Sequence, residues 1–232
     1  MANDIAKMMD LSCVQANSSY EEIVEAVKLA DKYDVAAVFV LPAHLEYAKA
    51  FAEKNDYKVK FAATAGFPSG SMATETKIAE AKMQIAAGCL EVDMVNNITW
   101  LKAGEVQKYR EDIQAVKNAV GDIPLKVILE CHYLTNDEIV TACEICAEIG
   151  VAFVKTGTGW AETGATLENV ALMKKTVGNR CEVKAAGGVR DLAIIEAMIE
   201  RGVTRFGIGV RTAKAILGEE DGSSREEVST NY

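Results

Sequence analysis

The chain of 232 residues contains only two histidines and three prolines. Two histidines offer no cluster of the ligands that transition metals prefer, so we expect neither a metal nor another cofactor. Six cysteines show none of the spacing of a disulfide framework. Cys143 and Cys146 form one CxxC motif within a helical pattern. Two partly buried helix positions explain that motif better than a redox or zinc site does.

The chain also lacks an excess of positive charge and long apolar segments. Its formal net charge is −9 and its pI is about 4.9, which argues against nucleic acid or an anionic membrane as a partner. No apolar segment is long enough to span a membrane, and no signal peptide is visible at the start. Unpaired thiols without an export signal predict a protein of the reducing cytoplasm.

Short apolar segments alternate with amphipathic stretches along the whole chain. Their spacing, roughly 30 residues for most of the chain, is typical of βα units. Alternation of eight strands with helices predicts a single (β/α)8 TIM barrel. An open doubly wound sheet is the alternative, but no GxGxxG motif follows the first strand. The eight predicted strands are Lys7–Leu11, Val35–Leu41, Val59–Ala65, Glu91–Val95, Leu125–Glu130, Phe153–Thr156, Glu182–Ala186 and Arg205–Ile208.

Several helices carry recognisable start signals, and no linker rich in Pro, Gly or Ser divides the chain. Residues that can cap a helix precede the amphipathic stretches at Thr135 or Asn136, at Thr166, and at Asp191 or its neighbours, and Ser19 with Glu22 has the pattern of a capping box. We therefore expect one domain, the barrel, over residues 1–217. Residues 218–232 are polar and acidic without periodicity, which predicts a flexible C-terminal tail.

Three lysines lie inside apolar, strand-like segments at equal intervals along the sequence. They are Lys126, Lys155 and Lys184, and Asp93 precedes the first of them by a similar interval. A lysine in a buried strand is costly, because desolvation disfavours the charged form and lowers the pKa. Because the three lysines recur at the interval of the βα unit, they indicate one polar site that they share. A neutral lysine beside cationic neighbours suits Schiff-base formation with a carbonyl substrate.

The position of each charge within its strand predicts its depth in the barrel. Active sites of such barrels lie at the carboxyl ends of the strands. Asp93, Lys155 and Lys184 fall at or near strand ends, whereas Lys126 falls near the start of its segment. We therefore expect Lys126 to lie deeper and to support the site by positioning and charge balance.

Seven segments, in the same order and over nearly the whole chain, resemble the deoxyribose-phosphate aldolases, the DeoC-type class I aldolases. The resemblance implies that Lys155 corresponds to the Schiff-base lysine, and that Asp93 and Lys184 correspond to the pair that donates and accepts protons. The segments are Gly66–Gly70, Thr74–Ala81, Glu91–Asn97, Leu125–Glu130, Phe153–Trp160, Gly164–Val170 and Val183–Arg190.

A phosphate group is expected near the last two strands, where barrel enzymes bind phosphate with backbone N–H groups and the N-terminus of a short helix. Glycine pairs follow the seventh and eighth predicted strands, and a hydroxyl and an amide follow the sixth. The candidate binding residues are Thr158, Gly159, Gly187, Gly188, Gly207, Gly209 and Arg211.

Several positions depart from the usual pattern of the family, and we expect most of them in the substrate pocket. Arg211 stands in a loop that usually carries serine; it either replaces hydroxyl donors or points to solvent. His132 is either a pocket contact or a loop histidine, and Tyr232 either reaches the site or ends a disordered tail. Asp10 and Ser12 only loosely match the usual Asp-x-Thr. The departures that bear most on the substrate are Phe39, Gly157, Trp160, Val210 and Arg211.

The resemblance and the lysine pattern together predict a class I aldolase. It would cleave 2-deoxy-D-ribose 5-phosphate reversibly to glyceraldehyde 3-phosphate and acetaldehyde. An alternative is a Schiff-base aldolase for a different phosphorylated or anionic sugar, and a less favoured one is a barrel that binds sugar phosphates without turnover. The expected partners are a sugar phosphate, an aldehyde and further copies of the chain, in a homodimer or a larger homo-oligomer.

Overall fold

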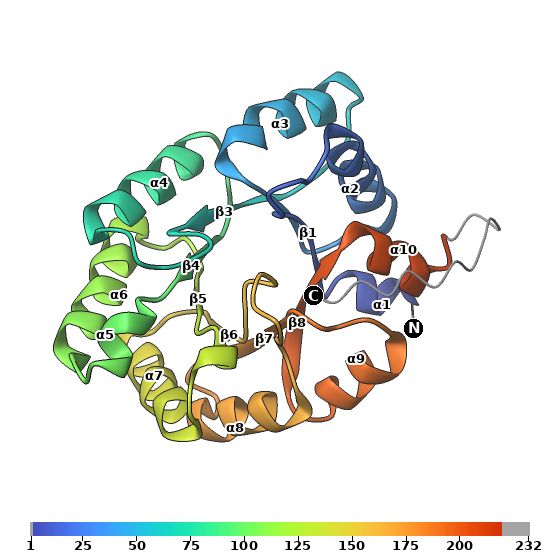
Figure 1. Ribbon diagram of the computed structural model, residues 1–232. Helices are drawn as coiled ribbons and strands as arrows, with labels where there is room; N and C mark the ends of the chain where they lie inside the picture. Colours follow the sequence, from blue (N-terminus) through green and yellow to red (C-terminus); the bar gives the residue numbers. More distant parts are fainter. Residues whose placement is uncertain (1, 220–232) are drawn as a thin grey trace.

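The computed structural model describes residues 2–219 and shows eight parallel strands that close into a barrel in sequence order (Figure 1). Strand β8 pairs with β1, which closes the sheet and excludes the open doubly wound alternative. The strands are β1 (Met9–Cys13), β2 (Ala37–Val40), β3 (Phe61–Ala65), β4 (Val92–Val95), β5 (Leu125–Ile128), β6 (Phe153–Lys155), β7 (Glu182–Ala186) and β8 (Val203–Gly209).

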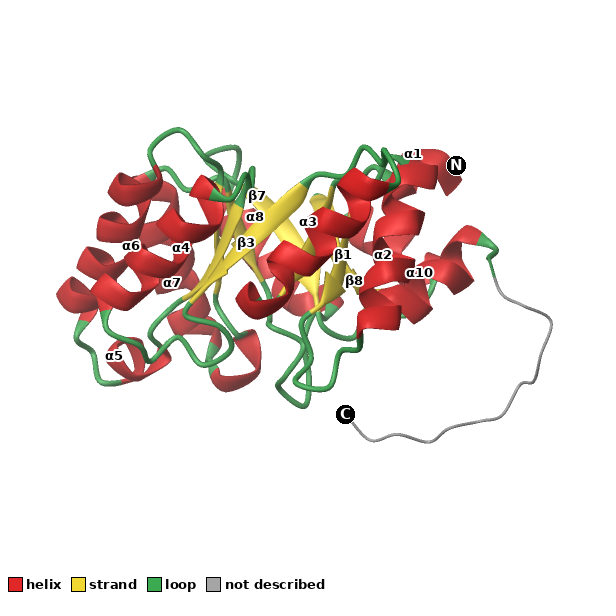
Figure 2. Cartoon of the chain, turned by 90° about the horizontal axis from the view of Figure 1, so that it is seen from above, coloured by secondary structure: helices red, strands yellow, loops and turns green. Residues whose placement is uncertain are grey.

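Helices surround the barrel on its outer face, and the predicted (β/α)8 fold is confirmed (Figures 1 and 2). Short 3₁₀ helices, η1 and η2, follow β2 and β5. The helical segments are α1 (Ala2–Ala6), α2 (Tyr20–Tyr33), η1 (Pro42–His44), α3 (Leu45–Lys54), α4 (Thr74–Ala86), α5 (Ile98–Lys102), α6 (Val106–Val120), η2 (Cys131–Tyr133), α7 (Asn136–Ile149), α8 (Leu167–Val177), α9 (Leu192–Ile199) and α10 (Val210–Leu217).

All eight predicted strands overlap an observed strand, and the largest error is in the first. Strand β1 begins at Met9 rather than at Lys7, because the chain turns at Lys7 and Met8 after the short helix α1. The backbone N–H of Met8 donates to the carbonyl of Ile5 at 2.9 Å in that turn. The shift moves Ser12 and Cys13 into the strand.

The predicted helix starts are confirmed by side-chain caps. Thr135 and Thr166 each form a complete capping box with the residue three positions later, and Asp191 accepts a hydrogen bond from the N–H of Ile194 at 2.8 Å. At α2 only half of the box forms. Ser19 accepts from the N–H of Glu22, while the Glu22 carboxylate lines the cavity described below.

The strand register brings the buried charges together inside the barrel. Lys155 lies opposite Lys184 across β6 and β7, and Asp93 lies opposite Lys126 across β4 and β5. Neighbouring residues on these strands point the other way, toward the helices. The outward-facing valines next to the three lysines are fully buried in the main hydrophobic core: Val127, Val154 and Val183.

The cysteines of the described chain lie in its interior. All six cysteines are free and buried. Cys143 and Cys146 lie within α7, where burial raises the pKa of both thiols, as expected for packed helix positions rather than a reactive pair. No helix between residues 2 and 219 is long and apolar enough to cross a membrane.

Candidate active site

One carboxylate, that of Asp93, contacts all three strand lysines at the centre of the barrel. Its Oδ2 lies 2.8 Å from Lys155 Nζ and 2.7 Å from Lys184 Nζ. Its other oxygen, Oδ1, lies 3.0 Å from Lys126 Nζ. Asp93, Lys126 and Lys184 are completely buried. The structure thus places in direct contact the four charges that the sequence pattern grouped.

Three further charged residues complete this cluster, and the sequence analysis did not assign them to the site. Asp10 pairs with Lys184 at 2.6 Å and with Arg205 at 2.8 Å. Glu91 pairs with Lys126 and, at 3.3 Å, with Arg205. Asp10 and Arg205 lie within strands, and Glu91 immediately precedes β4. The signal that singled out the lysines, a charge within or beside an apolar strand segment, applies to all three.

The cluster, as described within residues 2–219, carries an excess of one positive charge when every group is ionised. Balance is reached if one lysine is neutral, and an unpaired buried charge is costly. The side chain of Lys155 is 8% exposed, whereas those of Lys126 and Lys184 are fully buried. The cluster consists of four cations and three carboxylates: Lys126, Lys155, Lys184, Arg205, Asp10, Glu91 and Asp93.

Burial and neighbouring charges shift the pKa values of the cluster in different directions. Burial alone would raise the pKa of the Asp93 carboxyl, but the three lysines hold it well below its usual range. Burial lowers the pKa of the Lys184 ammonium to about 8, although Asp10 and Asp93 oppose this shift. For Lys126 burial also lowers the pKa, but the attraction of three carboxylates outweighs burial, and the pKa is raised. Of these two lysines, Lys184 is the one that can release a proton near neutral pH.

Another buried lysine shows what a purely structural ion pair looks like in this fold. Lys77 of α4 lies 2.7 Å from Asp112 of α6, and both side chains are at most 1% exposed. The Thr74 hydroxyl donates to the same carboxylate at 2.8 Å. Here one cation meets one anion between two helices, and neither residue lines the cavity that Lys155 lines. The strand lysines differ because, together with Arg205, they outnumber the three carboxylates of their cluster, and because one of them lines the cavity.

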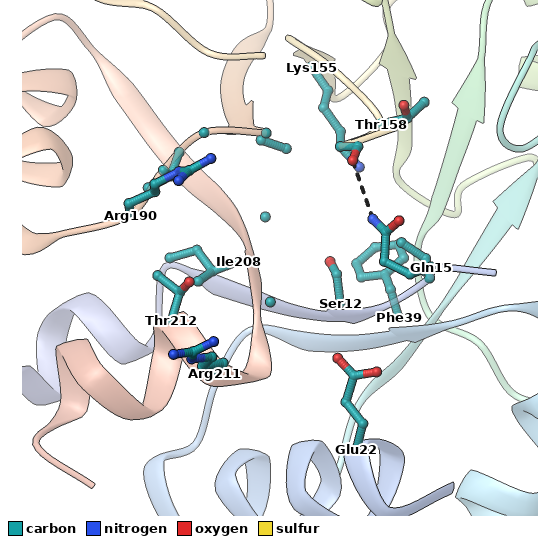
Figure 3. Close-up of a pocket in the computed structure, with 18 of the residues that line it drawn as sticks. Ser12, Gln15, Glu22, Phe39, Lys155, Thr158, Arg190, Ile208, Arg211 and Thr212 are labelled. Carbon is teal, nitrogen blue, oxygen red and sulfur yellow. Dashed lines mark hydrogen bonds between the residues drawn. The ribbon is translucent and has the colours of Figure 1, made fainter. Parts of the chain in front are cut away.

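Above the cluster lies a cavity of about 530 Å³, and Lys155 lines it. All seven residues predicted to bind substrate or phosphate also line it. Figure 3 shows Arg190, Arg211 and Thr212 on the side formed by the end of β7, β8 and α10, with Ser12, Gln15 and Phe39 on the opposite side. One end of the cavity therefore holds the amine and the other holds two guanidinium groups.

The glycines at the cationic end are placed differently from the prediction. Gly207 and Gly209 lie within β8 rather than after it, because the ladder to β1 continues as far as the pair Ser12 and Gly209. Helix α10 begins directly after Gly209, so its N-terminus faces the cavity lining. Gly187 and Gly188 have φ of +79° and +80°, which expose the backbone in a conformation that glycine adopts readily.

Comparison with known proteins places this architecture in a family. Residues 4–217 match the model of the DeoC/LacD family aldolases. The chain belongs to this family. A deoxyribose-phosphate aldolase of Mannheimia succiniciproducens is 43% identical over 220 residues, 95% of this chain and 97% of the relative. One of Shouchella clausii is 43% identical over 225 residues, 97% and 99% of the two chains. The solved structure of the aldolase QR15 is 36% identical with a TM-score of 0.85, covering 93% of this chain and 95% of that one.

In this aldolase a second carboxylate, that of Glu130, organises the loop after β6. Glu130 is buried, has a φ of 56°, and accepts the N–H of Thr158 at 3.2 Å and the Thr158 hydroxyl. Burial raises its pKa. A Cβ at Gly157 would lie 2.7 Å from the Glu130 carboxylate, so a larger residue at this position would have to displace that side chain. Sequence reasoning missed Glu130, because a glutamate at a strand end is usually a surface residue.

The rim of the aldolase cavity is held together by contacts between loops. Trp160 donates from Nε1 to the carbonyl of Val14 at 2.9 Å and packs edge-on against Phe67. Gln15 donates to the carbonyl of Gly159 at 3.3 Å (Figure 3). The loop after β6 is thereby tied to the loop after β1. The tryptophan, 43% exposed, covers the rim rather than lining the cavity.

The five departures that bear most on the substrate divide between the cavity lining and other positions. Phe39 and Arg211 line the cavity, whereas Gly157, Trp160 and Val210 do not. Val210 is 2% exposed within the hydrophobic core, because it opens a helix that packs on the barrel.

Other uncertain positions of the sequence analysis are also placed. His132 does not line the cavity, and its Nδ1 lies 2.7 Å from the Thr163 hydroxyl. It is therefore a loop contact rather than a pocket contact. Tyr232 and the rest of the predicted tail from residue 220 lie outside the described residues. Within residues 2–219 no group of three or more His, Cys, Asp or Glu could hold a metal.

Replacing Asp10 with Asn should destabilise the barrel in a pH-dependent way. The Asp10 carboxyl is buried and its pKa is lowered, although burial opposes this, by Lys184, Lys126 and Arg205. Its contribution is present above the unfolded pKa of about 3.9 and is lost as the pH falls through the lower folded value. Breaking a buried pair costs about 3–5 kcal/mol.

Urea unfolding at pH 7 and at a series of lower values measures the effect. We expect Asp10→Asn to lower the free energy of unfolding at pH 7, and the difference from the wild type to shrink below about pH 4. The exposed Asp122→Asn is the matched control and should behave as wild type at every pH. An equal deficit at all pH values would show that shape, not charge, accounts for the loss.

Proposed function

We propose that the protein is a class I aldolase that reversibly cleaves 2-deoxy-D-ribose 5-phosphate to acetaldehyde and glyceraldehyde 3-phosphate. The observation that carries this proposal is the position of Lys155. It alone of the three strand lysines lines the cavity, and it does so while in contact with a carboxylate that a second buried lysine shares. The names of the relatives, deoxyribose-phosphate aldolases at 43% identity, support the same substrate.

In the first step the neutral amine of Lys155 attacks the aldehyde carbon, C1, of the open-chain sugar. Loss of water then gives an iminium ion, whose positive charge attracts electrons from the neighbouring bonds. The attack requires the unprotonated amine, because an ammonium group has no free electron pair. Asp93, in contact with Lys155 Nζ at 2.8 Å, is placed to stabilise the iminium after it forms.

In the second step the bond between C2 and C3 breaks while the C3 hydroxyl loses its proton. The electron pair of that bond moves toward the iminium and leaves an enamine of acetaldehyde, and C3 becomes the aldehyde carbon of glyceraldehyde 3-phosphate. A proton must then reach C2 before water hydrolyses the iminium. Asp93 and Lys184, joined at 2.7 Å, are the groups we assign to these proton transfers.

The cationic end of the cavity is the proposed site for the phosphate. Arg190 and Arg211 line it together with the backbone of Gly187 and Gly188 and the start of α10. Guanidinium groups and helix N-termini both favour a phosphate dianion. Of the two alternatives for Arg211, its place in the cavity lining favours the replacement of serine hydroxyls by a cation.

The residues at the cationic end of the cavity also support a second candidate, an aldolase for another phosphorylated or anionic sugar. Arg211 and Gly209 stand where the family pattern has other residues, and both line the anion end. A barrel that binds sugar phosphates without turnover is disfavoured, because the amine and both proton-transfer groups lie in contact. We also propose that the protein is a cytoplasmic homo-oligomer, as the family resemblance and the free thiols imply.

A cleavage screen with the variant Lys155→Ala separates these candidates. We expect the wild type to cleave 2-deoxy-D-ribose 5-phosphate faster than other phosphorylated pentoses and hexoses, with release of glyceraldehyde 3-phosphate followed by a coupled assay. Loss of the nucleophile should lower kcat by at least about 10³-fold. The exposed Lys82→Ala of α4 is the control and should match the wild type. Faster cleavage of a different sugar would favour the second candidate, and an active Lys155→Ala would refute the Schiff base.

The pH dependence of cleavage should report Lys184. Its pKa, lowered by burial to about 8, leaves it cationic below that pH and neutral above it. If its ammonium form donates the proton, kcat/KM should fall as the pH rises through about 8. The arginine of Lys184→Arg stays cationic at all these pH values, so kcat/KM of this variant should fall less as the pH rises through about 8, even if it is lower than that of the wild type. A wild-type kcat/KM that keeps rising through pH 9 would contradict the assignment.

A further inference from the structure

The ring of Phe39 forms the wall of the cavity beside the nucleophile. Phe39 lies on β2, is 2% exposed, and lines the cavity together with Lys155 and Ser12 (Figure 3). Its register partner on β1 is Ser12, and on β3 it is Ala62. A large aromatic side chain thus fills the part of the barrel that small neighbours leave open.

Contacts with the charge cluster fix the position of this ring. Its centroid lies 4.2 Å from Lys184 Nζ, 5.0 Å from Lys126 Nζ and 5.8 Å from Lys155 Nζ. An ammonium within about 6 Å of an aromatic centroid is attracted by the electron density of the ring face. On its other sides the ring packs in a small apolar cluster with Val14, Ala37 and Ala62, against Leu41 and Phe67. The ring is therefore a rigid boundary rather than a side chain that can swing aside.

This boundary limits the space around any carbon attached to Lys155. In the proposed reaction the donor aldehyde is covalently attached to Lys155 Nζ as an iminium or enamine. Lys155 Nζ lies 5.8 Å from the centroid of the Phe39 ring, and the two donor carbons lie about one and two bond lengths from Nζ. Non-bonded carbons pack at about 3.5–4.0 Å. The two carbons of acetaldehyde fit between these limits, whereas a further carbon that extends from either of them toward Phe39 would come closer to the ring than contact distance.

We propose that Phe39 is the residue that restricts the donor to a two-carbon aldehyde. The inference rests on the proposed function, because it takes Lys155 as the point of attachment. Propanal adds a carbon at the nucleophilic position of the enamine, and acetone adds one at the imine carbon. Both are excluded by the ring, while the acceptor, which approaches from the opposite, cationic side of the cavity, is not affected.

Aldol synthesis with glyceraldehyde 3-phosphate as acceptor tests this proposal. The measured quantity is the ratio of kcat/KM for acetaldehyde to that for propanal and to that for acetone. One methylene in a pocket is worth about 10–200-fold. We expect Phe39→Ala to lower at least one of the two ratios by about tenfold or more, with Phe39→Leu changing it in the same direction by less.

A buried phenylalanine outside the cavity provides the matched control. Phe61 of β3 is 5% exposed and belongs to the main hydrophobic core. Phe61→Ala loses a similar amount of core packing, so it should keep both ratios at the wild-type values. Phe39→Leu supplies the measurement if Phe39→Ala does not fold.

The outcomes distinguish this inference from the function on which it rests. Donor ratios in the Phe39 variants within twofold of the wild type would overturn the inference, while synthesis from acetaldehyde by the wild type would still support the aldolase. A wild-type protein that fails to use acetaldehyde at all would refute the proposed function, and with it the role of Phe39.

Discussion

The contact on which the site depends is the one between the Asp93 carboxylate and three lysine ammonium groups. Without this carboxylate, Lys126, Lys155 and Lys184 would face one another in a dry barrel with only Asp10 and Glu91 to offset them. With it, the cluster of four cations and three carboxylates is within one charge of balance. The carboxylate that stabilises the barrel centre is therefore also the one that contacts the lysine in the cavity lining.

Closure of the sheet is what makes this contact possible. The four residues come from β4, β5, β6 and β7, and the register pairs Asp93 with Lys126 and Lys155 with Lys184. Pairing of β8 with β1 then brings Arg205 against Asp10, which anchors Lys184 from the far side. A small displacement of one strand would leave a buried charge unpaired, so the cluster and the closed barrel require each other.

Much of this arrangement could be predicted from the sequence, and the exceptions have physical reasons. Asp93 and the strand lysines were visible because charges rarely occur in apolar strand segments. Arg205 and Glu91 carry the same signal, but they lie at predicted strand ends, where a charge normally reaches solvent. The role of Glu130 depends on a left-handed backbone conformation and on its contact with Thr158, neither of which has a local sequence pattern. Contacts between loops, such as that of Trp160 with Val14, depend on tertiary geometry alone.

We propose that one lysine of the cluster, Lys155, is the nucleophile, while its neighbours balance charge and transfer protons. Reduction with borohydride in the presence of acetaldehyde, followed by mass spectrometry of the peptides, tests it most directly. We expect an ethyl group on Lys155 and on no other lysine of the barrel centre. An ethyl group on Lys126 or Lys184 instead, or no adduct on the peptide that contains Lys155, would contradict it.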